Sequence, residues 1–101
     1  LGLTTSLRYE LWDENIRLST IIPGTVATSI WAGGPIPDFA ITPDESARGI
    51  LKCLAANERV IFVTDMDREG AINSTDPRAA EGIDKYLLDV ARKRRTGTGL
   101  F

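Results

Sequence analysis

The stretch Ile16-Arg17-Leu18-Ser19-Thr20-Ile21-Ile22-Pro23-Gly24-Thr25-Val26-Ala27-Thr28 decides the fold of this chain. Residues 16–22 form an apolar, β-branched run without clean alternation, which is typical of a parallel strand buried on both faces. Pro23 lacks an amide hydrogen and therefore ends the strand. In open α/β sheets, ligands bind outside the carboxyl ends of the strands, so residues 23–28 are the first candidates for a binding site.

A helix and a second strand are expected further along the chain. Thr42-Pro43-Asp44-Glu45 has the spacing of a capping box with proline at the first helical position. The apolar positions of the predicted helix are Ala47, Ile50, Leu51 and Leu54. Residues 60–64 are again a continuous apolar run, so strand, helix and strand predict one parallel βαβ unit.

The flanking segments complete the predicted order of elements. Residues 1–13 repeat leucine every fourth position and predict a helix that Asn15 ends in the left-handed conformation. Residues 65–77 are polar and rich in turn formers, which predicts a loop. A last helix is expected over residues 79–95, with its apolar face formed by Ile83, Tyr86, Leu87, Val90 and Ala91.

The connection over residues 23–41 is long and carries large apolar side chains. Connections of this length are often lids or binding loops. Ile30, Trp31 and Phe39 lie in it, and a loop that only met solvent would rarely hold all of them. The alternative interpretation is a local hydrophobic cluster beneath the loop.

Composition narrows the class of protein. The chain has 101 residues, 43% of them hydrophobic, and a formal net charge of −2. This is the size of one small domain and gives no overall positive field, so we predict no nucleic-acid partner. Residues 92–95 are the one basic cluster, and a solvated helix end explains it better than a phosphate or membrane contact. No apolar run is long enough to cross a bilayer, and we predict a cytoplasmic protein without membrane contact.

Several catalytic and metal-binding chemistries are excluded by residue type. The chain has no histidine, which removes a Ser-His-Asp triad and any histidine-based metal site, and we predict no metal. Cys53 is the single cysteine, so no intrachain disulfide forms. Without a histidine to activate it, Cys53 is interpreted as a buried small apolar residue.

Two parallel strands with flanking helices do not make a complete sheet. Parallel sheets are stable when both faces are covered, normally with several more strands. The predicted fold class is therefore α/β, with residues 1–101 as part of a single domain whose parallel sheet has further strands. We expect the amino-terminal half of that single domain to be missing from this chain.

The order of motifs resembles the late part of a short-chain dehydrogenase/reductase. The segment Gly2-Leu3-Thr4-Thr5-Ser6-Leu7-Arg8-Tyr9-Glu10-Leu11 is similar to the helix that follows that family's Tyr-x-x-x-Lys pair. Residues 16–24 are similar to its next strand and Pro-Gly turn. The resemblance implies a doubly wound, Rossmann-like parallel sheet, of which residues 1–101 supply the last two strands and their flanking helices. The resemblance is good over residues 1–31, fair over 42–64 and weak beyond. Tyr9 and Tyr86 are not followed by lysine at the fourth position, and no glycine-rich phosphate loop is present, so no catalytic residue of the family is carried by this chain.

The resemblance implies a site for NAD or NADP. It implies that Pro23, Gly24 and Thr25 form a turn beside the nicotinamide ring, that Val26 offers its backbone to the carboxamide, and that the Thr28 hydroxyl bonds the same group. It also implies that Ile30 and Trp31 belong to a mobile substrate loop. For residues 23–28, a plain turn with Thr28 as a helix cap remains an alternative.

The resemblance thus implies an NAD(P)-dependent oxidoreductase that interconverts an alcohol and a carbonyl, present as an inactive fragment of a parent that forms homo-oligomers. The family's helix matching residues 1–13 often packs in a subunit interface. The alternative is a small non-catalytic α/β interaction module with an apolar binding loop around Trp31. The family resemblance identifies neither the substrate nor the choice between NAD and NADP.

Overall fold

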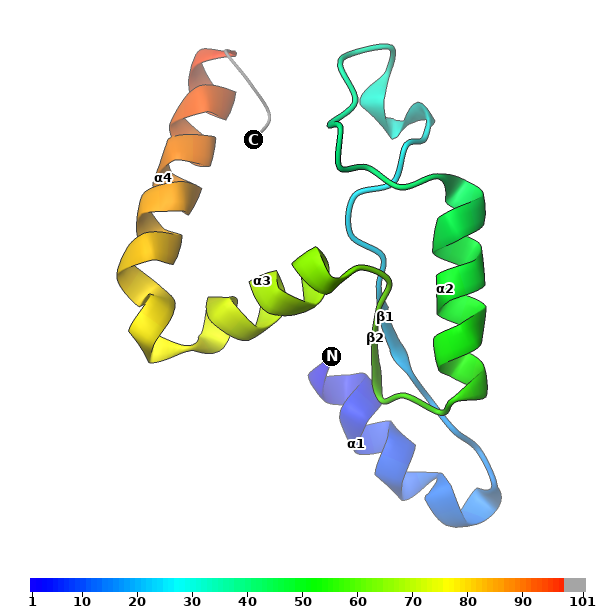
Figure 1. Cartoon of the computed structure of the whole chain (residues 1–101). Coiled ribbons are helices and arrows are strands. Elements are labelled where there is room, and N and C mark those ends of the chain that lie inside the picture. The colour runs from blue at the N-terminus through cyan, green and yellow to red at the C-terminus, as the bar shows by residue number, and fades with distance from the viewer. Residues whose placement is uncertain (98–101) are drawn as a thin grey trace. The chain divides into compact units, whose positions relative to one another are not determined.

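The computed structural model describes residues 1–97, which divide into two compact units, Leu1–Asp67 and a second beginning at Arg68. The fold is α/β, with helices and strands alternating over most of the chain (Figure 1). The elements in chain order are α1 (Gly2–Glu10), η1 (Trp12–Glu14), β1 (Thr20–Ile22), η2 (Ser29–Trp31), α2 (Pro43–Ala55), β2 (Val60–Phe62), α3 (Asp65–Thr75), η3 (Pro77–Ala79) and α4 (Ala80–Thr96), where η marks a short 3-10 helix.

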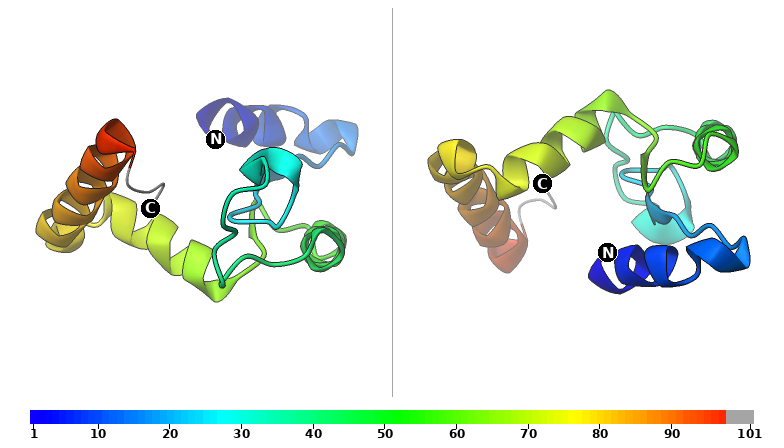
Figure 2. Two further views of the ribbon diagram at one scale, coloured as in Figure 1. Left: turned by 90° about the horizontal axis from the view of Figure 1, so that it is seen from above. Right: turned by 90° about the horizontal axis from the view of Figure 1, so that it is seen from below.

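The predicted parallel strand pair is confirmed. β1 pairs with β2 in the register Thr20 with Val60, Ile21 with Ile61, and Ile22 with Phe62. The α2 crossover runs alongside the pair and is seen end-on in the two further views (Figure 2). Ile61 is fully buried and is the centre of the small core of the first unit.

Both strands are shorter than the predicted ranges 16–22 and 60–64. The residues before β1 use other partners: the Ser19 hydroxyl donates to the Glu58 carbonyl at 2.6 Å, and the Leu18 carbonyl accepts from the Arg8 guanidinium. These side-chain bonds replace the regular backbone ladder, so the strand begins at Thr20.

The expectation that the first strand is buried on both faces was wrong for this chain. Ile21 is 40% exposed and Ile16 is 43% exposed. A strand with a single hydrogen-bonded neighbour has a free edge, and the described residues form too few layers to cover both faces of the pair. The segment is apolar, as its sequence shows, but the packing of residues 1–97 leaves Ile16 and Ile21 partly exposed to solvent.

Helix α2 begins as predicted but faces the sheet with different residues. The Glu45 amide donates to the Thr42 hydroxyl at 3.1 Å, and the Thr42 amide donates to the Glu45 carboxylate at 3.0 Å, so the capping box is confirmed. Ser46 is buried and Gly49, Ile50 and Cys53 are half-buried, whereas the predicted core residues Ala47, Leu51 and Leu54 are exposed.

A close approach at Gly49 explains this rotation of α2. A Cβ atom at Gly49 would lie 2.6 Å from Val63 Cγ1, so only glycine lets the helix pack this closely on the residue that follows β2. Gly49 and Val63 thus select a helix face of small residues, and the leucines are turned toward solvent. Cys53, on the sheet-facing side, is half-buried rather than fully buried.

A buried arginine, not a leucine, is the most buried residue of α1. Leu3 is 74% exposed, whereas Arg8 is only 4% exposed. The Arg8 guanidinium donates to the Leu18 carbonyl, to the Asn57 carbonyl at 2.9 Å and to the Asn57 side-chain oxygen at 2.8 Å. Arg8 therefore joins α1 to the segments that precede β1 and β2.

An aromatic and cationic cluster surrounds the end of α1. The Trp12 ring lies 3.5 Å from the Arg17 guanidinium carbon and stacks with Tyr9 at a centroid distance of 6.2 Å. Arg59 donates to the Tyr9 hydroxyl at 3.4 Å, and this bond lowers the pKa of Tyr9. Asn15 has the predicted left-handed conformation, with a φ of 56°, but it ends η1, because the helix predicted over residues 1–13 already ends at Glu10.

The prediction of a loop over residues 65–77 was wrong, because residues 65–75 form α3. The Asp67 amide donates to the Thr64 hydroxyl at 3.2 Å, which caps the helix start, and Asp65 and Asp67 lie favourably in the first turn. The polar residues that suggested a loop occupy the other end of the helix, where Ser74 and Thr75 bond backbone carbonyls one turn earlier.

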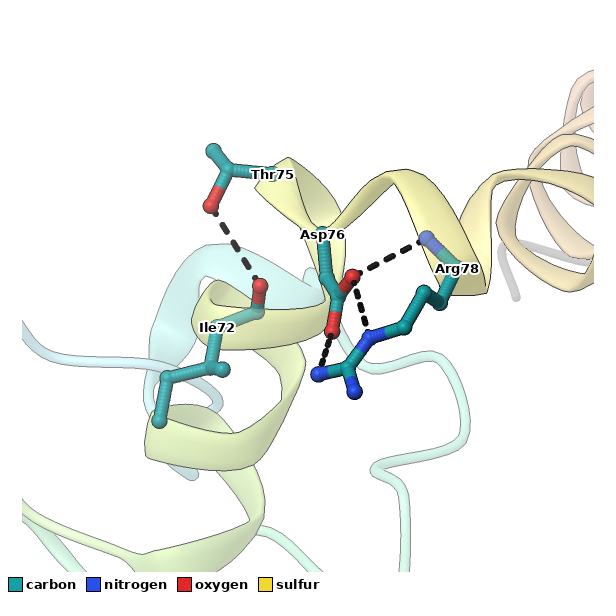
Figure 3. A network of polar contacts seen from close by, with 4 residues as sticks. All are labelled: Ile72, Thr75, Asp76 and Arg78. Atoms are coloured by element: carbon teal, nitrogen blue, oxygen red, sulfur yellow. Dashed lines mark hydrogen bonds and ion pairs between the residues drawn. The ribbon is translucent and has the colours of Figure 1, made fainter.

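A bidentate ion pair follows α3 (Figure 3). The Asp76 carboxylate accepts from Arg78 Nε at 3.2 Å and from Arg78 Nη2 at 3.0 Å, and it also accepts from the Arg78 amide. These bonds to Arg78 lower the pKa of Asp76. Asp76 thereby caps η3 and positions the chain for α4, which begins and ends one residue after the predicted bounds and is followed by Gly97 with a φ of 71°.

We expect Arg8→Met to destabilise the first unit. The substitution keeps an apolar stem but leaves the carbonyls of Leu18 and Asn57 without their buried donor, at a cost of about 1–3 kcal/mol. Urea unfolding followed by circular dichroism measures this free energy. Arg48→Met, at an exposed position of α2, is the matched control. Equal stability of both variants would contradict the role given to Arg8.

Candidate functional site

The candidate site lies where the carboxyl ends of β1 and β2 meet in the first unit. Pro23 and Gly24 follow β1, and Thr64 leads from the segment after β2 into α3. Because the strands are parallel, these segments lie at the same end of the pair. The structure therefore brings the predicted cofactor turn beside the segment that joins β2 to α3.

Gly24 is required by both its backbone and its neighbour. Its φ is +69°, a conformation that residues with side chains rarely adopt. A Cβ atom at this position would lie 2.7 Å from Asp67 Oδ1 and closer still to Oδ2. The close approach that the sequence predicted at Gly24 is therefore made, within the chain, to the Asp67 carboxylate.

The Asp67 carboxylate is held in place by Thr64. The Thr64 hydroxyl donates to Asp67 Oδ2 at 2.6 Å and accepts from the Asp67 amide at 3.2 Å. Sequence reasoning missed both residues because Thr64 was interpreted as the end of the second strand and Asp67 as part of a loop. The signal was available, since Thr64 directly follows an apolar run and stands three residues before a carboxylate, which is the spacing of a reciprocal helix cap.

The backbone around Val26 forms hydrogen bonds on two sides, to Ile41 on one side and to Trp31 on the other. The Ile41 amide donates to the Thr25 carbonyl at 3.1 Å, and the Ala27 amide donates to the Ile41 carbonyl at 2.9 Å. In such a parallel bridge, the amide and carbonyl of Val26 itself point away from Ile41. The Val26 carbonyl accepts from the indole nitrogen of Trp31 at 3.0 Å. The predicted backbone contact at Val26 is thus directed to the side of the chain on which Trp31 lies.

Thr28 caps the short helix η2. Its hydroxyl accepts from the Ile30 amide at 3.4 Å, so the alternative role as a helix cap describes its contact within the chain. This contact uses the hydroxyl as an acceptor and leaves its proton for another group. Thr28 is exposed, as are Pro23 and Gly24.

The apolar residues of the loop have different surroundings. Ile30 is 82% exposed and Phe39 is 48% exposed, whereas Trp31 is half-buried and anchored by its bond to Val26. A cluster beneath the loop would bury Ile30, so that alternative does not describe this residue. Trp31 instead holds the loop to the predicted cofactor turn.

The site offers binding groups and no proton donor of the tyrosine type. The two tyrosines belong to other elements, Tyr9 to α1 and Tyr86 to α4, and neither is part of residues 23–28 or 64–67. Over residues 1–97, no group of three or more histidine, cysteine, aspartate or glutamate side chains could hold a metal ion. In the same range, no helix combines the length and apolar character needed to cross a membrane. The site's chemistry is that of a backbone edge, hydroxyl groups and one fixed carboxylate.

Comparison with known proteins assigns the chain to no family: it matches no protein-family model, no curated protein and no solved structure.

We expect Gly24→Ala to destabilise the chain by about 2 kcal/mol or more, because a Cβ atom is strained at positive φ and collides with the Asp67 carboxylate. Adding Asp67→Ala removes the collision, so the double variant should lose less stability than the sum of the single losses. Asp65→Ala, in the same turn of α3, is the control partner and should be additive. Unfolding in urea measures all variants, and additivity for both partners would contradict the contact.

Proposed function

We propose that this chain forms the carboxyl-terminal part of an NAD(P)-dependent oxidoreductase that interconverts an alcohol and a carbonyl. The observation that carries the proposal is the turn of residues 23–28 at the carboxyl end of β1 in a parallel βαβ unit, where Pro23, Gly24 and Thr28 are exposed. Ligands of open α/β sheets bind at this end. The resemblance of residues 1–31 to the short-chain dehydrogenases supplies the identity of the ligand.

The groups at the turn fit the nicotinamide carboxamide. A carboxamide has a donor end and an acceptor end. The backbone amide and carbonyl of Val26, together with the Thr28 hydroxyl, offer partners for both ends. The indole of Trp31 uses one of the two lone pairs of the Val26 carbonyl, so a second donor can still bind there. In this proposal Pro23, Gly24 and Thr25 shape the turn, and the bound cofactor supplies the hydride.

Ile30 and Trp31 would face an alcohol or carbonyl substrate. Ile30 extends into solvent, and Trp31 ties its loop to the cofactor turn through Val26. A loop anchored at one residue and exposed at the next can close over a ligand and exclude water. Because the chain carries no Tyr-x-x-x-Lys pair, we propose that it binds cofactor without turning it over and that the proton donor belongs to the parent domain.

A second candidate function is a non-catalytic interaction module. Ile30, Ile36 and Phe39 are exposed by 82%, 46% and 48% and belong to the same connection. Exposed apolar side chains gathered in one loop favour a protein partner over plain solvent contact. This candidate needs no cofactor, which separates it from the first in a binding experiment.

We expect NADH and NADPH titrated into the ¹⁵N-labelled chain to shift the amide signals of Gly24, Val26 and Thr28, without hydride transfer to added carbonyl compounds. Thr28→Val should weaken binding by roughly 2- to 12-fold, the effect of one lost hydrogen bond.

Thr5→Val is the matched control for that titration, since the Thr5 hydroxyl bonds only the Leu1 carbonyl within α1. Absence of shifts at residues 23–28 at millimolar dinucleotide would refute the oxidoreductase proposal and favour the interaction module. Catalytic turnover by the chain alone would refute the proposal that the proton donor belongs to the parent domain.

A further inference from the structure

Helix α4 in the second unit has an exposed face that its fold does not use. Side chains four positions apart lie above one another on a helix. Asp84 and Leu88 form one such row, and Leu87, Ala91 and Arg95 form the row beside it. Leu87 is 54% exposed and Leu88 is 52% exposed, and the other members of this face are exposed too. We call these five residues the outer face of α4.

The outer face is distinct from the covered side of the same helix. Val90 is 7% exposed and Ile83 is half-buried, and they form a separate stripe. At 100° per residue, Leu88 lies about 160° around the helix from Val90. The leucine at position 88 therefore has no part in covering Val90, and its apolar surface remains available to a partner.

Charges at the two ends of the outer face are opposite. Asp84 precedes the leucines, and Arg95 follows Ala91. The helix dipole accounts for acidic residues in the first turn and basic residues in the last turn, and thus for Glu81 and for Arg95. It does not account for Asp84, which lies beyond the first turn and on the same face as the leucines.

The outer faces of two copies of α4 are complementary to each other when the two helices run antiparallel. The pairs Asp84 with Arg95 and Leu88 with Ala91 share one midpoint, between Asp89 and Val90. A single two-fold axis at that point therefore places Asp84 of each chain opposite Arg95 of the other, and Leu88 opposite Ala91. The small side chain of Ala91 lets the helices approach, and the same pairs form on both sides of the axis.

We propose that the outer face of α4 is the docking surface for α4 of a second copy of this chain, in an antiparallel pair. The occupant is identified by charge complementarity, because Asp84 at one end of the face matches Arg95 of a second copy, whereas a nucleic acid or an anionic membrane would repel Asp84. This inference goes beyond the proposed function and does not depend on it, since the family resemblance concerned an interface formed by residues 1–13.

The test is a charge exchange in the full chain, measured by sedimentation equilibrium from about 1 µM to about 1 mM, a range that covers weak associations. Asp84→Arg or Arg95→Asp alone turns both attractive pairs of the homodimer into repulsive ones. Each single variant should associate about tenfold more weakly than the unchanged chain, and the loss should shrink at high salt.

Mixing the two single variants restores both pairs, so an equimolar mixture should associate as the unchanged chain does, and so should the double variant D84R/R95D. Asp89→Arg, on the opposite side of α4, makes the same change of charge and should leave association within about twofold of the unchanged chain. Circular dichroism checks that each variant keeps its helix.

A chain that stays monomeric throughout the range would overturn the proposal. So would association that survives both single exchanges, or one that mixing fails to restore. Binding to anionic lipid vesicles that Asp84→Arg strengthens, in place of self-association, would assign the face to a membrane surface instead.

Discussion

The parallel pairing of β1 with β2 is the constraint on which the first unit depends. Parallel strands require a crossover, and residues 23–59 provide it with a loop, a capped helix and a tight return. The pairing places residues about forty positions apart at the same end of the strands. Without it, Gly24 would not meet Asp67, and the candidate site would not exist.

Two close contacts and one buried cation hold the elements in this arrangement. Gly49 lets α2 approach Val63, and Gly24 leaves room for the carboxylate of Asp67. The absence of a Cβ atom therefore permits close packing at both places. At the other end of the strands, the guanidinium of Arg8 bonds backbone carbonyls before both β1 and β2. This buried guanidinium is bound by carbonyl oxygens and lies 5.4 Å from the centre of the Trp12 ring, which makes α1 specific for one position on the strands.

Exposed apolar surface connects the proposals made for the two units. Ile21, Leu51 and Ile30 in the first unit and Leu87 and Leu88 in the second are all 40% exposed or more. Our proposals assign the first group to a larger sheet and to a substrate or partner protein, and the second group to the matching helix of another copy. A carboxylate fixed beside the turn of residues 23–28 also gives that end of the candidate site an acidic group, which the Thr64 hydroxyl holds in place.

Local sequence by itself determined most of the elements and several of their ends. The capping box at Thr42, the left-handed residue at Asn15 and the stop at Gly97 depend on neighbours within a few positions, and all were predicted. The parallel order of the strands also followed, because an apolar run, a helix and a second run leave little choice. The helix over residues 65–75 was missed because its cap, Thr64 with Asp67, was overlooked among turn-forming residues.

Only the tertiary structure decided which faces are buried and which groups meet. Periodicity placed Leu3, Leu51 and Leu54 inside, yet Arg8, Ser46 and Gly49 took the inner positions, because backbone carbonyls needed donors and the helix needed room beside Val63. The contact of Gly24 with Asp67 joins two strand ends, and no local pattern specifies a distance across the chain. Burial and long-range contact depend on the three-dimensional neighbours of a residue, whereas caps and turns depend on its neighbours in sequence.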